Sequence, residues 1–484
     1  MGTVVLRSRQ CQGNYLTERL VGIQNSKPSL PPPKVRLESL AAVAENQPVN
    51  KHRMIKELSS FAARLREAFF FRPSPPGTRA VCISDRQFSE LALELFALQF
   101  QLNPLYRRIC EARQRTPGNV EHWTQIPFVP TAAFKELELS SIPLHERTAV
   151  FHSSGTTEQK PSRHFHSIES LAVYEASLWA WFARTFLGGT GDLPVPSGDP
   201  PDGTEKTLHT GQGSLLTTTP IPIPFGGSPS GGSASPARPR LLFLTPDPKA
   251  APHSSLVHMF ETVRQNLGAA GDAAGGSPFV GRLENDGAWG LDFAAVMAML
   301  NHQPPCPIGQ PLLILGTAFS LVHLLDFLAE KHLRLDLPPG SRVMETGGYK
   351  NRSRVLPKSE LHSLITEKLG IVPEKIICEY GMSELSSQAY DNALQPPASS
   401  LQPRTFHLPP WARVQISSPE TGREVTEGEP GLIRIFDLAN VFSVAALQTE
   451  DLAIRRSEGF ELIGREPLAE PRGCSLNSLE TLRH

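Results

Sequence analysis

The sequence predicts an α/β protein in which parallel sheets are flanked by helices, with a small β-rich subdomain near the C-terminal end. Hydrophobic residues make up 39% of the 484 residues and charged residues 20%, which is typical of a soluble globular protein with a large core. Short apolar strands alternate with helical segments through the middle of the chain, which favours parallel pairing. Residues 412–463 instead read as short strands separated by turns.

Composition excludes several classes of protein. The net charge of −1 and the pI of about 7.0 give no indication of a nucleic-acid partner. No apolar run approaches the roughly 18 residues of a transmembrane helix, so no transmembrane segment is expected. The six cysteines are scattered without a C-x-x-C pair, which predicts reduced thiols, a cytoplasmic location and no zinc site.

Four segments differ in character. We expect residues 1–50 to form a poorly ordered, basic N-terminal extension, with an organelle-targeting peptide as the alternative. Residues 51–410 should form the α/β body. Within it, the Gly/Pro/Ser/Thr-rich stretch 188–240 predicts a disordered insert, because this composition buries too little apolar surface to fold. Residues 411–484 should form the β-rich subdomain and a short tail.

The body begins with two predicted helices. Apolar residues recur at helical spacing over 52–70, and Asp85 opens a second helix whose buried stripe continues to Leu98. Pro127 and Pro130 then impose an extended path. Later strands are predicted at 241–244, 312–315, 342–344 and 375–378, with helices through 321–328 and over 358–369. The C-terminal strands are predicted at 414–417, 432–436, 452–455 and 460–463.

The first chemical motif is the hydroxyl-rich stretch 150–164. Its hydroxyls favour turns over regular structure, and its glycine lets the backbone approach a ligand closely. Successive N–H groups in a turn bind anions, which predicts a nucleotide-phosphate loop; a solvated Ser/Thr turn is the alternative. The stretch contains no Walker motif. Its candidate nucleotide-binding residues are Ser153, Ser154, Gly155, Thr156, Thr157 and Lys160.

The second motif is Glu379-Tyr-Gly-Met-Ser-Glu384, which follows an apolar strand. Ligands of α/β folds bind at the carboxyl ends of strands. Tyr380 offers a face for adenine, with Gly381 beside it. Ser383 can hydrogen-bond a phosphate oxygen, and the Glu384 carboxylate suits Mg²⁺. Upstream, Gly347 and Gly348 follow another strand, where backbone can approach a nucleotide.

These motifs, in this order, resemble those of the adenylate-forming ligases. The longer string that ends in Ser162-Arg163-His164, together with Glu345-Thr-Gly-Gly, is similar to one branch, the LuxE-type acyl-protein synthetases, or long-chain-fatty-acid–luciferin-component ligases. The resemblance covers roughly residues 85–480 apart from the insert. It implies an adenylate-forming body that uses ATP and Mg²⁺, a carboxylic (by default fatty) acid as substrate, and an acyl-CoA-reductase-like protein as acyl acceptor.

The resemblance also implies roles for later residues. Asp451 matches the acid that binds ribose, and Arg465 matches a hinge arginine that contacts ribose or phosphate. Two positions depart from the wider pattern. Glu158 replaces a glycine, so that Lys160 is displaced by one residue and Arg163 is a second candidate for the phosphate. Glu450 replaces the glycine before Asp451.

Residues 466–484 follow the hinge, so we expect the mobile C-terminal lid of the wider superfamily to be absent or minimal. LuxE-type enzymes carry their acyl-accepting cysteine near the C-terminus, which makes Cys474 the candidate nucleophile. Arg472 beside it would favour the reactive thiolate; a small buried hydrophobe is the alternative. His164, and with less support His253, could polarise the carboxylate or close the acyl pocket.

Together these features predict an ATP-dependent acyl-protein synthetase. A carboxylate would attack the α-phosphate of ATP, and the acyl-adenylate would then be transferred to Cys474 as a thioester. Two alternative functions are also consistent with the sequence. One is an acyl-CoA ligase of the phenylacetate-activating type, and the other is a non-catalytic nucleotide- or acyl-binding scaffold, which the departures at Glu158, Lys160 and Glu450 favour.

Overall fold

The computed structural model describes most of the chain between residues 48 and 465. The chain divides into two units, Met1–Asn46 and Gln47–His484, and only the second has described residues. The predicted N-terminal extension, nearly all of the predicted insert and Cys474 lie outside the described ranges. No helix within them is long and apolar enough to cross a bilayer. The described residues are 48–69, 83–153, 160–188, 239–268, 277–285, 287–300, 310–347, 354, 356–391, 404–457 and 459–465.

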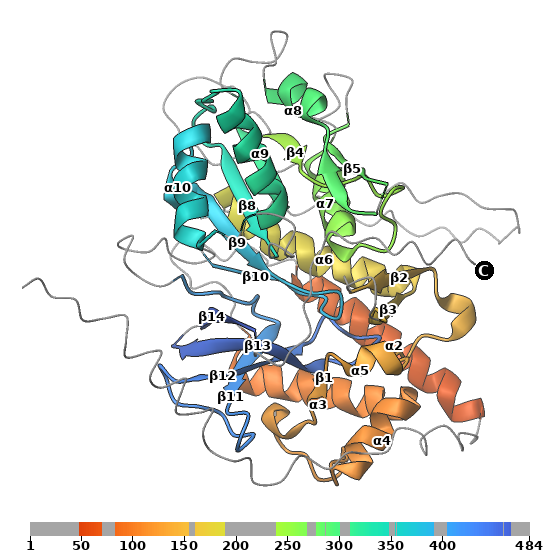
Figure 1. The fold of residues 1–484 in the computed structure, drawn as a ribbon. Coiled ribbons are helices and arrows are strands. Elements are labelled where there is room, and N and C mark those ends of the chain that lie inside the picture. The colour runs from red at the N-terminus through yellow and green to blue at the C-terminus, as the bar shows by residue number, and fades with distance from the viewer. Residues whose placement is uncertain are drawn as a thin grey trace, which may run out of the picture. The chain divides into compact units, whose positions relative to one another are not determined.

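A mainly parallel sheet forms the upper part of the unit in Figure 1. Its strands lie in the order β10-β9-β8-β7-β4, and neighbours from β9 to β4 pair in parallel. The short β10 pairs antiparallel with β9 and closes one edge. The strands are β4 (Arg240–Phe243), β7 (Leu312–Thr317), β8 (Arg342–Thr346), β9 (Ile376–Tyr380) and β10 (Ala389–Tyr390).

Alternate residues of these strands enter two different cores, because successive side chains point to opposite faces. Leu242, Ile314 and Val343 pack with helices α9 (Ala318–Glu330) and α10 (Lys358–Leu369). Phe243, Leu315 and Met344 instead pack with α6 (Ile168–Ala183) and α7 (Ser255–Leu267). Burial on both faces explains why the strands read as continuous apolar runs.

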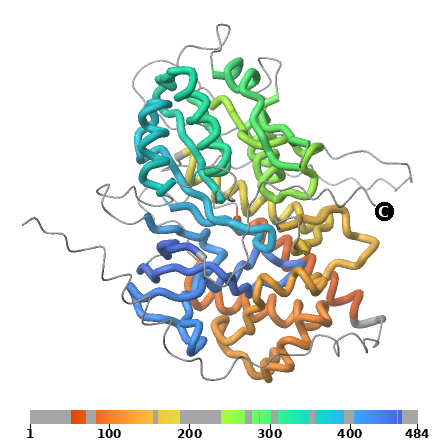
Figure 2. The backbone as a smooth tube through the Cα atoms, in the orientation of Figure 1, coloured from red at the N-terminus to blue at the C-terminus, as the bar shows by residue number. Residues whose placement is uncertain are grey.

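The second sheet lies below the first in Figure 1. Its four long strands pair antiparallel, and the short β1 adds to β13 in parallel. Figure 2 shows the N-terminal helices in orange beside these C-terminal strands in blue. Buried Gln99 of α3 joins the two by donating to the carbonyls of Asn440 and Val441, both at 2.9 Å. The strands are β1 (Val129–Pro130), β11 (Ala412–Ser417), β12 (Pro430–Asp437), β13 (Ala446–Arg456) and β14 (Gly459–Arg465).

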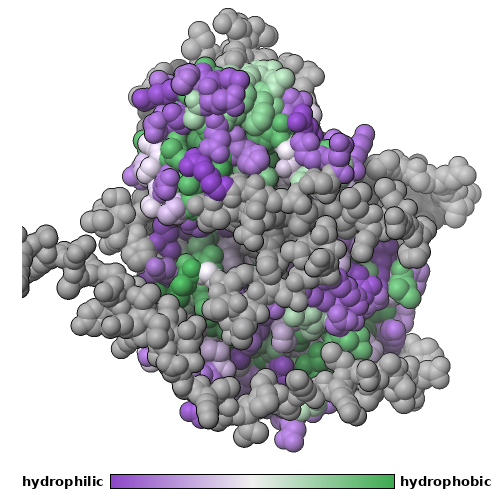
Figure 3. Space-filling view, in the orientation of Figure 1, coloured by the Kyte–Doolittle hydropathy of each residue, from purple (hydrophilic) through white to green (hydrophobic). Residues whose placement is uncertain are grey.

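The remaining elements are short or lie at the periphery. Hairpins pair β2 with β3 and β5 with β6. Helix α8 is wholly apolar although only its Val296 is fully buried, and Figure 3 shows hydrophobic surface over it. The elements are α2 (Pro48–Phe69), α3 (Asp85–Leu102), α4 (Pro104–Ala112), η2 (Trp123–Gln125), α5 (Ala133–Glu136), η3 (Leu144–Glu146), β2 (Ala149–His152), β3 (Arg163–His166), η4 (Arg184–Gly188), β5 (Gly281–Leu283), β6 (Trp289–Leu291), α8 (Phe293–Leu300) and η6 (Pro373–Lys375).

The predicted fold class is confirmed, with parallel pairing in the first sheet and short antiparallel strands after residue 411. Helix α10 has the predicted bounds, and Ser84 caps the helix that begins at Asp85. The strand predicted at 452–455 is the second half of β13, which begins at Ala446, where it pairs with Phe436 of β12. The domain boundary near residue 410 stays a prediction.

Candidate functional site

The hairpin β2–β3 holds both ends of the predicted phosphate loop. Ser153 leaves β2 and accepts a hydrogen bond from the Ser162 amide at its side-chain oxygen (2.9 Å), while its own amide donates to the Ser162 carbonyl (3.2 Å). The two residues therefore clamp the base of the loop. The other hydroxyl-bearing candidates, Ser154, Thr156 and Thr157, and Gly155 lie outside the described residues.

The two sequence motifs meet at the Glu384 carboxylate. Ser162 Oγ donates to Glu384 Oε1 at 2.6 Å, and Ser383 Oγ donates to Oε2 at 3.0 Å. Asn440 Nδ2 fixes the backbone by donating to the Glu384 carbonyl at 2.9 Å. The Glu384 and Ser162 side chains are fully buried. Residues more than two hundred positions apart in the chain thus share one charged hydrogen-bond network.

His164 adds a second link between the motifs. Its Nδ1 lies 2.5 Å from the Ser383 carbonyl, which can only accept, so Nδ1 carries the proton. Burial lowers the pKa of His164, against the opposing effects of that hydrogen bond and of Glu384. His164 is therefore a neutral residue that positions the loop after Tyr380. Its predicted role toward the carboxylate remains a prediction.

The oxygen atoms around Glu384 are of the type that binds a magnesium ion. Mg²⁺ prefers oxygen ligands and is commonly held by one or two carboxylates together with substrate phosphates. A single carboxylate flanked by the hydroxyls of Ser162 and Ser383 offers only oxygen atoms. Both carboxylate oxygens already accept hydrogen bonds, so an ion bound to Glu384 would compete with a serine hydroxyl.

The predicted adenine and ribose residues contact each other. Tyr380 Oη donates to Asp451 Oδ2 at 2.8 Å, which joins the end of β9 to β13. The Tyr380 ring lies edge-on to Phe460, with ring centroids 5.4 Å apart. Backbone pairing places Arg465 opposite Asp451. The carboxyl edge of the parallel sheet therefore lies beside the second sheet at this point.

Glycines mark the same edge of the sheet. Gly347 follows β8 with φ of 68°, a conformation that favours glycine. A Cβ on Gly381 would lie 2.2 Å from Glu379 Oε1, so a larger residue here would displace the Glu379 carboxyl group. Gly348 lies outside the described residues. The close approach of a ligand to these glycines stays a prediction.

The two predicted phosphate-binding cations are paired with acids. Lys160 Nζ lies 3.1 Å from Glu136, with each side chain 54% exposed. Arg163 lies 3.1 Å from Glu138, which Arg147 also contacts at 2.8 Å. The hydrogen bond from Arg147 lowers the pKa of Glu138 more than any other neighbour does. In the part of the chain that the structure describes, the buried Arg163 Nε has no hydrogen-bond partner.

His253 contacts strand β2 of the β2–β3 hairpin. Its Nδ1 lies 3.1 Å from the Val150 carbonyl, and its ring stacks on His152 with centroids 4.7 Å apart. Burial, together with the neighbouring His253 and Arg163, lowers the pKa of His152 to about 4. His152 is therefore neutral near pH 7, and its stacked partner His253 supports β2.

One buried polar group was not predicted from the sequence. Glu345, His362 and Cys378 lie together on the α10 face, with Glu345 Oε2 3.0 Å from His362 Nε2 and 3.2 Å from Cys378 Sγ. Arg404 lies 3.0 Å from His362 Nδ1. Because arginine can only donate, Nδ1 must accept and Nε2 carries the proton toward Glu345. The group is thus a hydrogen-bond network, with the imidazole in the wrong tautomer to bind a metal through Nε2.

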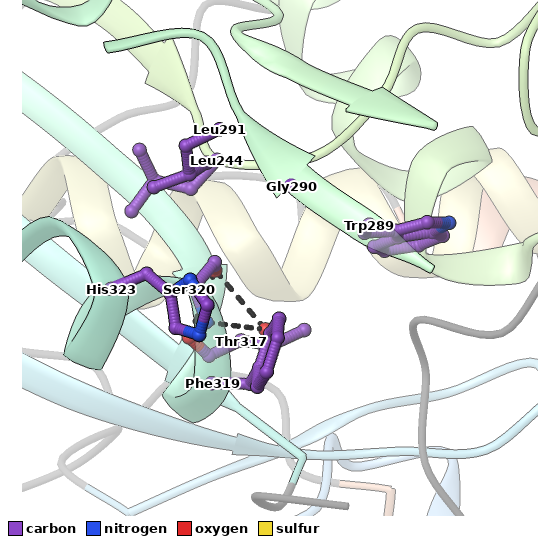
Figure 4. Close-up of a pocket in the computed structure, with 8 residues that line it drawn as sticks. All are labelled: Leu244, Trp289, Gly290, Leu291, Thr317, Phe319, Ser320 and His323. Carbon is purple, nitrogen blue, oxygen red and sulfur yellow. Dashed lines mark hydrogen bonds between the residues drawn. The ribbon is translucent and has the colours of Figure 1, made fainter. Parts of the chain in front are cut away.

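A narrow hollow lies at the carboxyl ends of β4 and β7 (Figure 4). It is mainly apolar and too narrow to hold a water molecule. Leu244 and Leu291 belong to the core on the α9 side of the sheet, so the hollow is separate from the network around Glu384. The residues that line it are Leu244, Trp289, Gly290, Leu291, Thr317, Phe319, Ser320 and His323.

Comparisons with known proteins found relatives of part of the chain. The family model described as "Acyl-protein synthetase, LuxE" matches residues 281–482. A long-chain-fatty-acid–luciferin-component ligase from Vibrio harveyi is 23% identical over 199 residues, 39% of this chain and 49% of that protein. Its namesake from Aliivibrio fischeri is 20% identical over 181 residues, 35% of this chain and 46% of that protein. The chain thus spans about half the length of the curated relatives it matches.

Solved structures of lower similarity were also found. A 2-hydroxyisobutyryl-CoA ligase in an open conformation is 12% identical, with a TM-score of 0.49 over 79% of this chain and 74% of that chain. ATP-bound MatB from Rhodopseudomonas palustris is 12% identical, with a TM-score of 0.39 over 85% of this chain and 73% of that chain. The sequence matches confirm the predicted resemblance to the LuxE-type acyl-protein synthetases.

Proposed function

We propose that this chain, similar over part of its length to the LuxE-type acyl-protein synthetases, activates a carboxylic acid with ATP and transfers the acyl group to a thiol. The observation that carries the proposal is the meeting of Ser162, Ser383 and Glu384 in one buried network. It joins a hydroxyl-rich anion loop to a carboxylate at the carboxyl end of a parallel sheet, where α/β proteins bind ligands.

In the first step, a carboxylate oxygen would attack the α-phosphate of ATP, forming the acyl–phosphate bond while pyrophosphate leaves. The chain's task is to align two anions and to neutralise their charge. The loop of residues 153–162 would supply N–H and hydroxyl donors, with Lys160 and Arg163 as cations. Mg²⁺ bound at Glu384 would supply further neutralisation of phosphate charge.

The nucleoside would lie along the edge marked by Gly347 and Gly381. Tyr380 would contact adenine, with its hydroxyl held by Asp451. The Asp451 carboxylate can also accept hydrogen bonds from ribose hydroxyls, and Arg465 lies opposite it on β14. His164 would keep the loop after Tyr380 in place through the Ser383 carbonyl.

In the second step, a thiolate would attack the acyl carbonyl, forming a thioester and releasing AMP. Cys474 is the proposed nucleophile, on the resemblance alone. An acyl-CoA-reductase-like protein is the proposed final acceptor, and a fatty acid the default substrate.

The test is intact mass spectrometry after incubation with ATP, Mg²⁺ and a panel of carboxylic acids, for the wild type and Cys474→Ser. We expect a hydroxylamine-labile acyl adduct on the wild type only. Acid-dependent pyrophosphate release without an adduct would retain the first step and move the acceptor to CoA or another protein. The absence of both an adduct and pyrophosphate release would refute the proposal and favour a binding scaffold.

A further inference from the structure

Four buried polar side chains form a row across the carboxyl end of the parallel sheet. Strand register places Thr317 beside Thr346, Thr346 beside Glu379, and Glu379 beside Tyr390. Residues in register on adjacent strands point to the same face. The four side chains are 2%, 4%, 7% and 0% exposed, respectively. We refer to them as the polar row.

The polar row adjoins the proposed nucleotide edge. Thr346 directly precedes Gly347, and Glu379 directly precedes Tyr380. The Glu379 carboxyl group extends toward that edge, since its Oε1 lies 2.2 Å from where a Cβ of Gly381 would be. Thr346, Glu379 and Tyr390 lie on the α6 side of the sheet, opposite the Glu345 group, whereas the Thr317 side chain accepts a hydrogen bond from the Ser320 amide at the start of α9.

The carboxyl group at the centre of the row has few partners. Thr346 Oγ1 donates to Glu379 Oε2, and no second hydrogen bond to this carboxyl group is found in the part of the chain that the structure describes. Burial raises the pKa of Glu379 to about 7, although Thr346 and Lys358 act in the opposite direction. Tyr390 Oη is fully buried and has no hydrogen-bond partner among the described residues. The row thus contains an open acceptor and an unpartnered hydroxyl on neighbouring residues.

The unmet hydrogen bonds of Glu379 and Tyr390 destabilise the folded state. A buried polar group without its hydrogen bonds lowers stability, and leucine or glutamine at residue 379 would avoid the charge. Tyr174 of α6 does not satisfy the row, because its hydroxyl donates to the Ser255 carbonyl at 3.3 Å. Buried titratable groups that lack partners beside a binding edge are typical of sites that recognise a ligand.

We propose that Glu379 and Tyr390 select the acid substrate by binding a hydroxyl group on its chain, so that the chain activates hydroxy acids in preference to unsubstituted acids. A substrate hydroxyl would donate to Glu379 and accept from Tyr390, which would satisfy both open groups. A plain alkyl chain would leave both groups buried without partners. This inference rests on the proposed function, because the reacting carboxylate must lie beside the ATP phosphates at the same edge.

The test measures kcat/KM for pyrophosphate release with hydroxy acids, with unsubstituted acids and with amino acids of equal chain length. We expect the wild type to prefer a hydroxy acid by at least about tenfold, since a site that hydrogen-bonds a substrate group rejects analogues without it. In Glu379→Leu, the ratio of kcat/KM for the hydroxy acid to kcat/KM for the unsubstituted acid should fall toward one. Tyr390→Phe, which removes only the phenolic oxygen, should reduce it severalfold and tests the inference if Glu379→Leu fails to fold.

Glu367→Gln, on the exposed side of α10, is the matched control and should keep the wild-type preference. A wild type that prefers unsubstituted acids or amino acids would overturn the inference while leaving the proposed function intact. A hydroxyl preference that survives in both Glu379→Leu and Tyr390→Phe would also overturn it. Absence of acid-dependent pyrophosphate release from the wild type would instead refute the proposed function itself.

Discussion

The Ser162 to Glu384 hydrogen bond can be tested without any assumption about activity. It joins two fully buried groups at 2.6 Å, and its acceptor is a carboxylate. Hydrogen bonds to charged groups contribute about 1.5–3 kcal/mol, against about 0.5–1.5 kcal/mol for neutral ones. Ser162→Ala should therefore lower the free energy of unfolding by about 2 kcal/mol. In a Glu384→Gln background, where the acceptor is neutral, it should cost only about 1 kcal/mol.

The assay is a double-mutant cycle in urea at pH 7, with the four proteins compared at an unchanged denaturant slope. The expected coupling between the two substitutions is about 1 kcal/mol. Ser383→Ala provides a comparison, because its 3.0 Å bond to the same carboxylate links adjacent residues and joins no distant segments. If Ser162→Ala costs the same in both backgrounds within about 0.4 kcal/mol, the two motifs are not joined through the Glu384 charge, and our account of the network is wrong.

Three further predictions follow from other contacts. Tyr380→Phe removes the hydrogen bond to Asp451 and should raise the KM for ATP about fivefold with little change in kcat, measured by ATP–pyrophosphate exchange; an unchanged KM would contradict a nucleotide role. The pKa of Glu379 is about 7 in the fold against 4.5 for a free carboxyl, so the folded state binds more protons and loses stability as pH rises through this window. Relative to wild type, Glu379→Gln should therefore gain about 3 kcal/mol between about pH 4 and pH 8 in urea unfolding, and a pH-independent difference would refute the buried acid. Arg404→Met leaves the buried Asp391 without its ion pair and should destabilise the protein by about 3 kcal/mol, whereas a neutral effect on the urea midpoint would show that the pair is dispensable.

The sequence predicts those features that depend on the pattern of neighbouring residues in the chain. Helix α10 and the parallel strands follow from apolar periodicity, and the clustering of the loop with Tyr380 and Glu384 follows from ligands binding at strand ends. The direct contact between Tyr380 and Asp451 has no local signal, because it depends on how the second sheet packs against the first.

The polar row illustrates what the sequence alone could not provide. Thr346, Glu379 and Tyr390 lie in three separate strands, and only the register of those strands makes them neighbours. Register is set by tertiary packing rather than by any local pattern in one strand. The sequence places Ser162 in the loop. Its hydrogen bond to Glu384 cannot be predicted from the sequence, because it depends on where β3 lies. A polar residue at the last position of several apolar strands is the signal that could have indicated the row.

Lys160 is displaced by one residue from the usual lysine position, but its contacts still allow it to bind a phosphate. Exposed ion pairs such as Lys160 with Glu136 contribute only about 0–1 kcal/mol, so a phosphate can replace the carboxylate at low cost. Arg163 is even better placed, because Glu138 would keep Arg147 at 2.8 Å if Arg163 turned to another anion. Its buried Nε already lacks a hydrogen-bond partner among the described residues. Both cations beside the loop are therefore held by interactions that a nucleotide phosphate can outcompete, and the departure from the usual lysine position leaves the proposed anion site with two cations.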